Sequence, residues 1–303
     1  MLQIAGGLLG LVVLVGAGLW LAIRINGAAV LDTVDRVAGG SGEAELLAET
    51  SYGPHPQQKL RVFAPPGEAG LPILVFVHGG SWRWGDPDDY TFVARAMADK
   101  GFVVVLAGYR LEDAGRYPAM LEDTAAAVGT MARRGGDFGG DPTRIVLAGH
   151  SAGAYNVAQV ALETRWLEQA GVAPGVIKGV VGLAGPYDFY PFDSDSTKAS
   201  FGSVGAGEES QPVNHARAGA PPMLLIHGEQ DTLVKPRNTR ALAKALSALG
   251  APVETVFYPG MDHNAPLISL ASPWRNDRDV VLRFAAFARR VTEVSVPVQA
   301  GQP

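Results

Sequence analysis

A serine in a glycine-flanked pentapeptide is the residue of this sequence that most directly suggests chemistry. Ser151 is the centre of GHSAG (149–153), which matches the pattern G-x-S-x-G. An apolar run expected to be a strand (144–148) precedes it, and a helical pattern follows over about 152–169. Glycines on both sides of the serine permit a sharp strand-to-helix turn on which the hydroxyl projects above a sheet. The pattern therefore predicts a nucleophile beside a helix N-terminus, which stabilises developing negative charge.

A serine hydroxyl needs a base that takes its proton and a carboxylate that orients the base. Among the six histidines, His263 is the expected base because it follows the last expected strand, after both the serine and a plausible acid. Asp231, directly after the expected strand 223–227, is the expected acid. His150 is expected to point away from the serine, because neighbouring side chains on a turn diverge. The rival acids are Glu229, Asp262 and Asp188.

A second glycine-rich turn offers the electrostatic part of the same chemistry. The segment HGGSW (78–82) follows the apolar run 73–77, so it lies at a strand end. Backbone N–H groups in such a turn can face an anion and form an oxyanion hole. The expected donors are the N–H groups of Gly79, Gly80, Ser81 and Ala152.

The elements that must position these residues alternate regularly along the chain. Short apolar runs typical of buried strands alternate with longer amphipathic helical segments, which predicts parallel strands covered by helices on both faces. Functional residues of such sheets lie beyond the carboxyl ends of the strands. The segment 189–220 breaks the rhythm and is expected to be a lid-like insertion. The expected strands are 45–52, 59–64, 73–77, 102–107, 144–148, 176–183, 223–227 and 253–258.

These motifs together resemble the α/β-hydrolase superfamily, and within it the carboxylesterase and lipase branch with an HGG oxyanion loop. That branch includes hormone-sensitive-lipase-like and kynurenine-formamidase-like esterases. The resemblance implies an α/β-hydrolase fold with a mostly parallel eight-stranded sheet, and a triad of Ser151, Asp231 and His263. It is carried by HGGSWRWGD (78–86), AGYRL (107–111), FGGDPTRIVLAGHSAGA (138–154), GPYD (185–188), HGEQDTLV (227–234) and GMDH (260–263).

The resemblance also shapes the expected activity. Ser81 stands where hormone-sensitive-lipase relatives usually have a third glycine, which favours the smaller HGG-x-W esterases and formamidases. We expect a serine hydrolase of carboxylic esters, of short chain, that works through an acyl-enzyme and needs no cofactor. Hydrolysis of an arylformamide or another amide is the first alternative, and a non-catalytic, membrane-anchored binding protein is the second. Trp82, Trp84 and Tyr187 are the candidates for substrate contacts.

Composition excludes several other classes of function. The formal net charge of the 303 residues is −5 without a basic run, so a nucleic-acid partner is not expected. Cysteine is absent, which excludes disulfides, thiolate metal sites and a cysteine nucleophile. No spacing of His, Asp and Glu predicts a metal site. Hydrophobic residues make up 47% of the chain and charged residues 18%, which excludes a disordered chain. The sequence does not specify an oligomeric state.

The N-terminus carries a separate signal. Residues 4–23 contain no charged side chain, and a helix of that length spans the ~30 Å core of a bilayer. We expect a single-pass membrane anchor over 1–25, with a cleaved signal segment or a buried core helix as alternatives. Arg24 and Arg36 follow the run and no basic residue precedes it, which favours a cytoplasmic position for the rest of the chain. A linker (26–44) with room for one short helix, a catalytic domain (45–294) and a short tail (295–303) complete the expected organisation.

Overall fold

The sheet is built as the sequence predicts, from eight mostly parallel strands. The computed structural model describes residues 18, 21–23, 26–40, 44–202 and 207–293. Its strand order is β1-β2-β4-β3-β5-β6-β7-β8; β1 pairs antiparallel with β2, β2 antiparallel with β4, and all later pairs are parallel. The strands are β1 Glu45–Ser51, β2 Lys59–Ala64, β3 Leu71–Val77, β4 Val103–Ala107, β5 Gly140–His150, β6 Ile177–Leu183, β7 Met223–Gly228 and β8 Val253–Tyr258.

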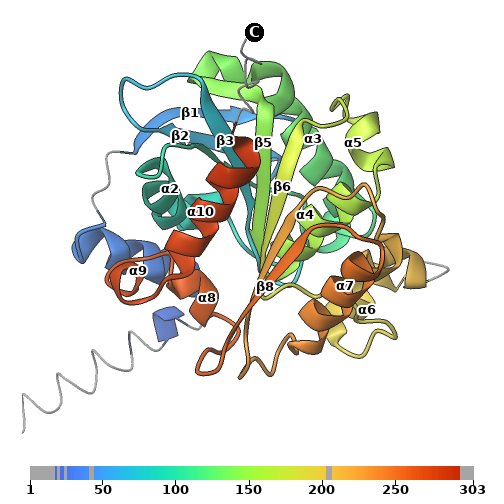
Figure 1. Cartoon of the computed structure of the whole chain (residues 1–303). Coiled ribbons are helices and arrows are strands. Elements are labelled where there is room, and N and C mark those ends of the chain that lie inside the picture. The colour runs from blue at the N-terminus through green and yellow to red at the C-terminus, as the bar shows by residue number, and fades with distance from the viewer. Residues whose placement is uncertain (1–17, 19–20, 24–25, 41–43, 203–206, 294–303) are drawn as a thin grey trace, which may run out of the picture.

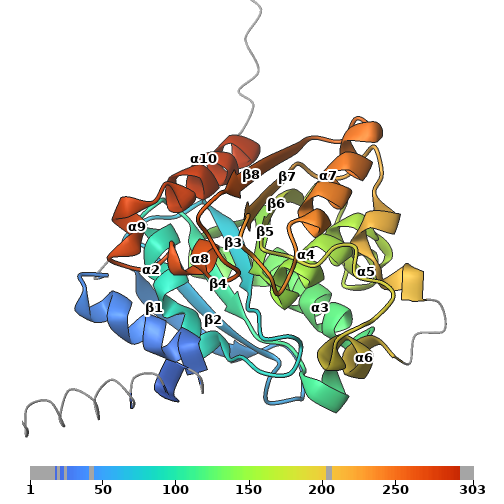
Figure 2. The same ribbon diagram turned by 90° about the horizontal axis from the view of Figure 1, so that it is seen from below.

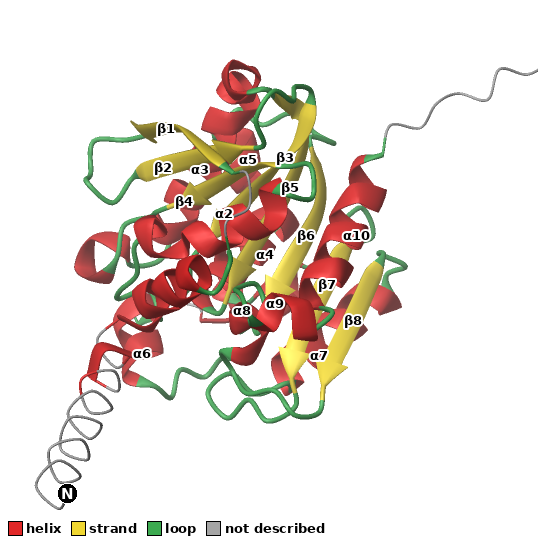
Figure 3. Ribbon diagram, turned by 90° about the vertical axis from the view of Figure 1, so that its left-hand side faces the viewer, coloured by secondary structure: helices red, strands yellow, loops and turns green. Residues whose placement is uncertain are grey.

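Helices cover both faces of this sheet, so the protein has three layers (Figures 1 and 3). One face packs against α3, α4 and α7, and the other packs against α2 and α10. Residues of the central strands alternate between the two cores: Val105 of β4 belongs to the first and Val104 to the second. The helices are α2 Thr91–Ala98, α3 Ala119–Arg134, α4 Ala152–Leu162, α5 Arg165–Gln169, α6 Asp195–Phe201, α7 Arg237–Ala248, α8 Ala265–Ile268, α9 Trp274–Asp277 and α10 Val280–Thr292.

The expected single helix over 152–169 is divided in two. Glu163, which follows α4, has extended backbone angles (φ −97°, ψ 91°), and α5 begins two residues later. Of the insertion 189–220, the structure describes 189–202 and 207–220, which contain the short helix α6 and two 3-10 turns, Gly207–Ser210 and Pro212–His215. Phe201 of α6 is buried in an aromatic cluster with Phe189 and Trp82. The insertion is therefore joined to the core by its aromatic side chains.

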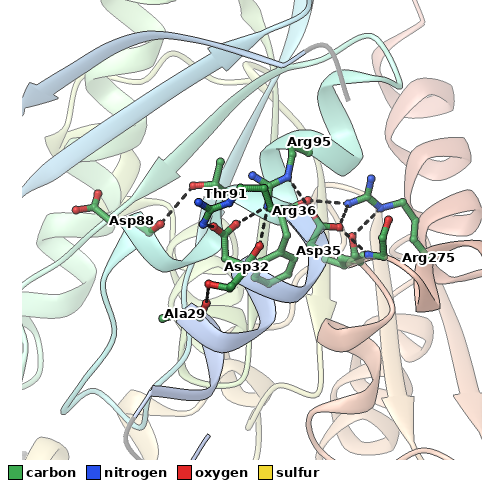
Figure 4. Close-up of polar contacts among 12 residues, drawn as sticks. Ala29, Asp32, Asp35, Arg36, Asp88, Thr91, Arg95 and Arg275 are labelled. Carbon is green, nitrogen blue, oxygen red and sulfur yellow. Dashed lines mark hydrogen bonds and ion pairs between the residues drawn. The ribbon is translucent and has the colours of Figure 1, made fainter. Parts of the chain in front are cut away.

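The segment expected to be a linker over 26–44 contains a helix that packs on the domain. Residues 26–37 form a helix that lies beside α2 and α9, as Figures 1 and 2 show in blue. Its Asp35 carboxylate is fully buried and accepts hydrogen bonds from Arg95 Nε of α2 at 2.6 Å and from Arg275 Nη2 of α9 at 2.8 Å (Figure 4). Asp32 accepts from Arg95 Nη2 at 2.6 Å. Four polar side chains from three distant segments thus hold this N-terminal helix against the domain.

The expected membrane anchor lies largely outside the described residues. Of the residues 1–25, the structure describes only 18 and 21–23. Within the described parts of the chain, no helix combines the length and the apolar character needed to cross a membrane. The tail expected over 295–303 also lies outside the described residues.

Candidate active site

The turn around Ser151 has the strained geometry that the glycine pattern predicts. Strand β5 ends at His150, Ser151 has φ 53° and ψ −119°, and α4 begins at Ala152. The Ser151 N–H donates to the Leu183 carbonyl of β6 at 2.8 Å, which fixes the turn against the neighbouring strand.

Both glycines of the pentapeptide are required by close backbone approaches. A Cβ atom on Gly153 would lie 2.1 Å from the Val77 carbonyl oxygen at the end of β3. A Cβ atom on Gly149 would lie 2.4 Å from the Gly153 carbonyl carbon. Neither backbone atom can move away cheaply, because both belong to the elements that hold the serine. The two glycines are therefore required because the backbones of β3, β5 and α4 come into close contact at this turn.

A continuous chain of hydrogen bonds joins Ser151, His263 and Asp231. The Ser151 hydroxyl lies 2.9 Å from His263 Nε2, and His263 Nδ1 lies 2.7 Å from Asp231 Oδ2. All three side chains are buried, with exposed fractions of 7%, 8% and 3%. With the proton on Nδ1, His263 donates to the carboxylate and its Nε2 accepts from the serine. The three residues follow the carboxyl ends of β5, β7 and β8. These strands are parallel, so their carboxyl ends lie along the same edge of the sheet.

Asp231 is held as an anion by several donors. Oδ1 accepts from the backbone N–H groups of Leu233 at 3.0 Å and Val234 at 2.8 Å. Oδ2 accepts from His263 and also from His227 Nε2 at 3.1 Å. Burial by itself disfavours the charged form, but the hydrogen bonds from the two histidines, together with the electrostatic interaction with His263 and the Val234 N–H, hold the Asp231 pKa well below its usual value.

His227 is a member of this group that sequence reasoning did not assign. Its Nδ1 accepts from the Thr239 hydroxyl at 2.8 Å, and its Nε2–H also reaches the Val234 carbonyl at 2.7 Å. The ring is fully buried. Its position four residues before Asp231, at the end of a strand, was the available signal.

The rival acids have other partners. Asp262 accepts from the backbone N–H groups of Asn264 and Ala265 and so caps the start of α8. Glu229 pairs with Arg240 at 2.5 Å. Asp188 lies 3.8 Å from Arg237. The geometry therefore leaves Asp231 as the carboxylate that contacts His263.

The HGGSW loop lies against Ser151 from the side of β3. A Cβ atom on Gly79 would lie 3.2 Å from Ser151 Cβ, and one on Gly80 (φ 119°) would lie 1.8 Å from the Trp84 carbonyl oxygen. Ser81 follows with φ 54°. Within the part of the chain that the structure describes, the N–H groups of Gly79, Gly80 and Ser81 donate to no acceptor. The first N–H of α4, on Ala152, has no partner inside its own helix. These four groups therefore remain available to an anion beside the serine.

Two further buried histidines border the site. His150 contacts the base: its ring centre lies 5.0 Å from that of His263, and its Nε2 donates to the His263 carbonyl at 3.1 Å. Burial, with a smaller electrostatic contribution from the neighbouring His263 ring, lowers the pKa of His150 to about 3. His78 stacks on Tyr109 at 4.7 Å, and burial lowers its pKa to about 4. Both rings are neutral at physiological pH and support the loops around the serine.

A cleft of about 730 Å³ opens over Ser151 and His263. Of the three expected substrate contacts, only Trp84 lines it, with 60% of its surface exposed. Trp82 lies in the core instead, where its indole N–H donates to Asn156 Oδ1 at 3.1 Å. Tyr187 is also buried, against the glycine backbone of Gly182 and Gly185. Large aromatic side chains next to a glycine-rich turn can pack inward as readily as outward, and here two of three pack inward.

The described residues contain no group of three or more His, Asp or Glu side chains that could hold a metal ion.

Comparison with known proteins identifies the family. The chain matches the family model described as BD-FAE over residues 60–246. It belongs to the BD-FAE family. The matched segment includes Ser151, the HGGSW loop and Asp231, whereas His263 follows it.

Curated relatives in this group are esterases and formamidases. The chain is 30% identical over 250 residues to isoprenylcysteine alpha-carbonyl methylesterase of Arabidopsis thaliana, covering 75% of this chain and 58% of that protein. It is 28% identical over 258 residues to esterase LipQ of Mycobacterium tuberculosis, covering 77% and 60%. It is 32% identical over 151 residues to kynurenine formamidase of Salmo salar, covering 50% and 49%. The chain thus spans less than two thirds of the length of these relatives.

Solved structures share the fold over most of both chains. Esterase B from Lactobacillus Rhamnosis matches with a TM-score of 0.76 and 20% identity, covering 92% of this chain and 95% of that one. A thermostable esterase from Pseudomonas putida matches with a TM-score of 0.71 and 24% identity, covering 88% and 89%. These likenesses establish the α/β-hydrolase fold, and the resemblance inferred from the sequence motifs is confirmed.

Proposed function

We propose that this chain is a carboxylesterase-type serine hydrolase. The observation that carries the proposal is the hydrogen-bonded series Ser151, His263 and Asp231, at 2.9 and 2.7 Å, beside a loop with free N–H groups. Esterases among the curated relatives support the same conclusion.

In the proposed mechanism, Ser151 Oγ attacks the ester carbonyl carbon while His263 Nε2 takes the hydroxyl proton. The imidazolium so formed is stabilised by the ionised Asp231. The carbonyl oxygen becomes an oxyanion and accepts hydrogen bonds from the N–H groups of Gly79 or Gly80 and of Ala152. Collapse expels the alcohol, which receives its proton from His263, and leaves an ester on Ser151. Water activated by His263 then releases the acid and restores the serine.

Hydrolysis of an arylformamide is the second candidate, and the kynurenine formamidase relatives favour it. The same residues would act on the formyl carbonyl, with an aromatic amine as the leaving group. The two reactions differ in the group that must fit beside the serine, so they are separated by substrate comparison.

A covalent probe and a substrate pair test the proposal. A fluorophosphonate should label the wild-type protein and the Ser200→Ala variant, which alters another buried serine, but not Ser151→Ala. Wild type that is folded and unlabelled would exclude the hydrolase and favour a non-catalytic binding protein. Hydrolysis of p-nitrophenyl acetate should exceed that of N-formylkynurenine. The opposite order would replace the esterase by the formamidase.

We also propose that residues 1–25 anchor the protein to a membrane and that the catalytic domain lies on the cytoplasmic side. The uncharged run over 4–23 and the arginines that follow it support this topology. The full chain should remain in the membrane fraction after a high-salt wash, and it should resist external protease in spheroplasts. Release by salt would exclude the anchor, and digestion in intact spheroplasts would reverse the orientation.

A further inference from the structure

The cleft over Ser151 has an apolar wall that the catalytic chemistry does not require. On one side lie the serine, His263 and the oxyanion loop. The facing residues come mainly from two other places in the chain and are mostly apolar. They include Val30, Leu31 and Val34 of the N-terminal helix (26–37), together with Leu267 and Ile268 of α8 and Trp274 of α9. Asn26 of the same helix, Asp89 and Asn264 are polar residues that also line the cleft.

The size of the cleft exceeds what a small acyl group needs. Its volume of about 730 Å³ lies within the range typical of pockets that enclose entire drug-sized molecules. An acetyl or butyryl group would leave most of the apolar wall in contact with water. Removing that wall from water favours a substrate with a longer apolar part.

The N-terminal helix is fixed in this position by the Asp35 cluster. Asp35 Oδ1 accepts from the Ser272 N–H at 2.6 Å and from Arg275, and Oδ2 accepts from Arg95. The same helix turn presents Val34 to the cleft and Asp35 to the domain. Gly40 makes room for this arrangement, because a Cβ atom there would lie 2.2 Å from Asp35 Oδ2. The ion pairs, drawn in Figure 4, therefore hold the helix that carries Val34 against the domain.

We infer that the helix 26–37 is a specificity element and that the substrate is an ester with a linear apolar chain, which lies between this helix and α8–α9. The inference rests on the proposed esterase function and replaces the short-chain preference expected from the sequence. Asp35 acts as a positioning residue, since it contacts the arginines and not the substrate.

The first experiment compares kcat/KM for p-nitrophenyl acetate, butyrate and octanoate on the wild-type full chain. Each buried methylene adds favourable transfer free energy, so octanoate should exceed butyrate by at least about tenfold. Octyl acetate compared with ethyl acetate tests whether the chain is accepted on the alcohol side instead. A preference for the long chain in either arm supports the inference. Equal or falling values in both arms would overturn it, even with a fully active enzyme.

Paired substitutions on one helix localise the effect. Val34→Phe fills the cleft and should lower kcat/KM for octanoate about tenfold relative to acetate. Val37→Phe makes the same change on a side chain that is 83% exposed and outside the cleft, so it should leave the octanoate-to-acetate ratio unchanged. An unchanged ratio in Val34→Phe, or an equal fall in Val37→Phe, would contradict the assignment of the wall.

Asp35→Asn tests the positioning role. The octanoate-to-acetate ratio should fall at least about threefold while acetate hydrolysis and fluorophosphonate labelling persist, because the serine and its partners are untouched. A ratio equal to that of wild type in a folded, labelled variant would exclude the role. Where Asp35→Asn does not fold, Val34→Phe still decides the inference. Absent labelling in wild type would instead refute the proposed function, so the two failures are distinguishable.

Discussion

The Asp231→Asn variant should retain its fold and lose most of its activity. In the transition state, the positive charge on His263 faces the Asp231 carboxylate, whose Oδ2 lies 2.7 Å from Nδ1. At a separation of about 4 Å between the centres of charge, with an effective dielectric of about 20, the attraction is about 4 kcal/mol. Since each 1.36 kcal/mol changes the rate about tenfold, kcat should fall about 1,000-fold.

The proposed assay is steady-state hydrolysis of p-nitrophenyl acetate near neutral pH, with thermal unfolding to verify that the variant is folded. Asp262→Asn is the matched control, because Asp262 is adjacent to His263 in sequence but caps α8. It should keep kcat within about twofold of wild type, since it contributes only a helix cap. The reasoning is refuted where folded Asp231→Asn keeps more than about a tenth of wild-type kcat, or where Asp262→Asn shows the larger loss.

Three further predictions follow from the packing around the site. Gly153→Ala should destabilise the protein by about 3 kcal/mol, because the new Cβ meets backbone carbonyls at 2.1 and 2.5 Å; Gly136→Ala, which meets nothing within 4 Å, is the control in urea unfolding. His227→Ala should lower kcat about tenfold with little change in KM, by loosening Asp231, and His227→Gln should restore part of the activity. Burial lowers the His78 pKa from 6.5 to about 4, so on acidification the unfolded chain protonates this residue at a higher pH than the folded chain does. The free energy of unfolding should therefore fall by about 1.4 kcal/mol per pH unit from this residue as the pH falls from 6.5 to about 4, and His78→Phe should remove that part of the slope in urea titrations.

Much of the fold was accessible from local pattern. Continuous apolar runs such as 103–107 mark strands covered on both faces, and their alternation with amphipathic helices implies parallel order. The structure differed from the prediction where short-range sequence periodicity carries no information about tertiary contacts. Glu163 interrupts a helical pattern that continues on either side, and the 26–44 segment was interpreted as a linker because it is polar and contains glycine. The aspartates of this segment do not face solvent as those of a linker would. They pair with the arginines of α2 and α9.

The catalytic group divides in a similar way. The series of Ser151, Asp231 and His263 was accessible because each residue ends a recognisable strand and the chain order assigns its part. His227 and His150 were not assigned, because their contacts with Asp231 and His263 depend on how neighbouring strand ends meet in space. Trp82 was a candidate substrate contact because it lies on the HGGSW loop, but position on a loop does not determine which way the side chain points.

The sequence by itself determined the fold class, the serine on its turn and the order of the triad, since these depend on short-range periodicity and on glycines at fixed positions. Only the tertiary structure decided what faces the serine. Asp35 and Arg275 are 240 positions apart, and their pairing brings the N-terminal helix across the cleft. No local period encodes such a contact. It exists because a buried carboxylate requires a charged partner wherever the folded chain supplies one.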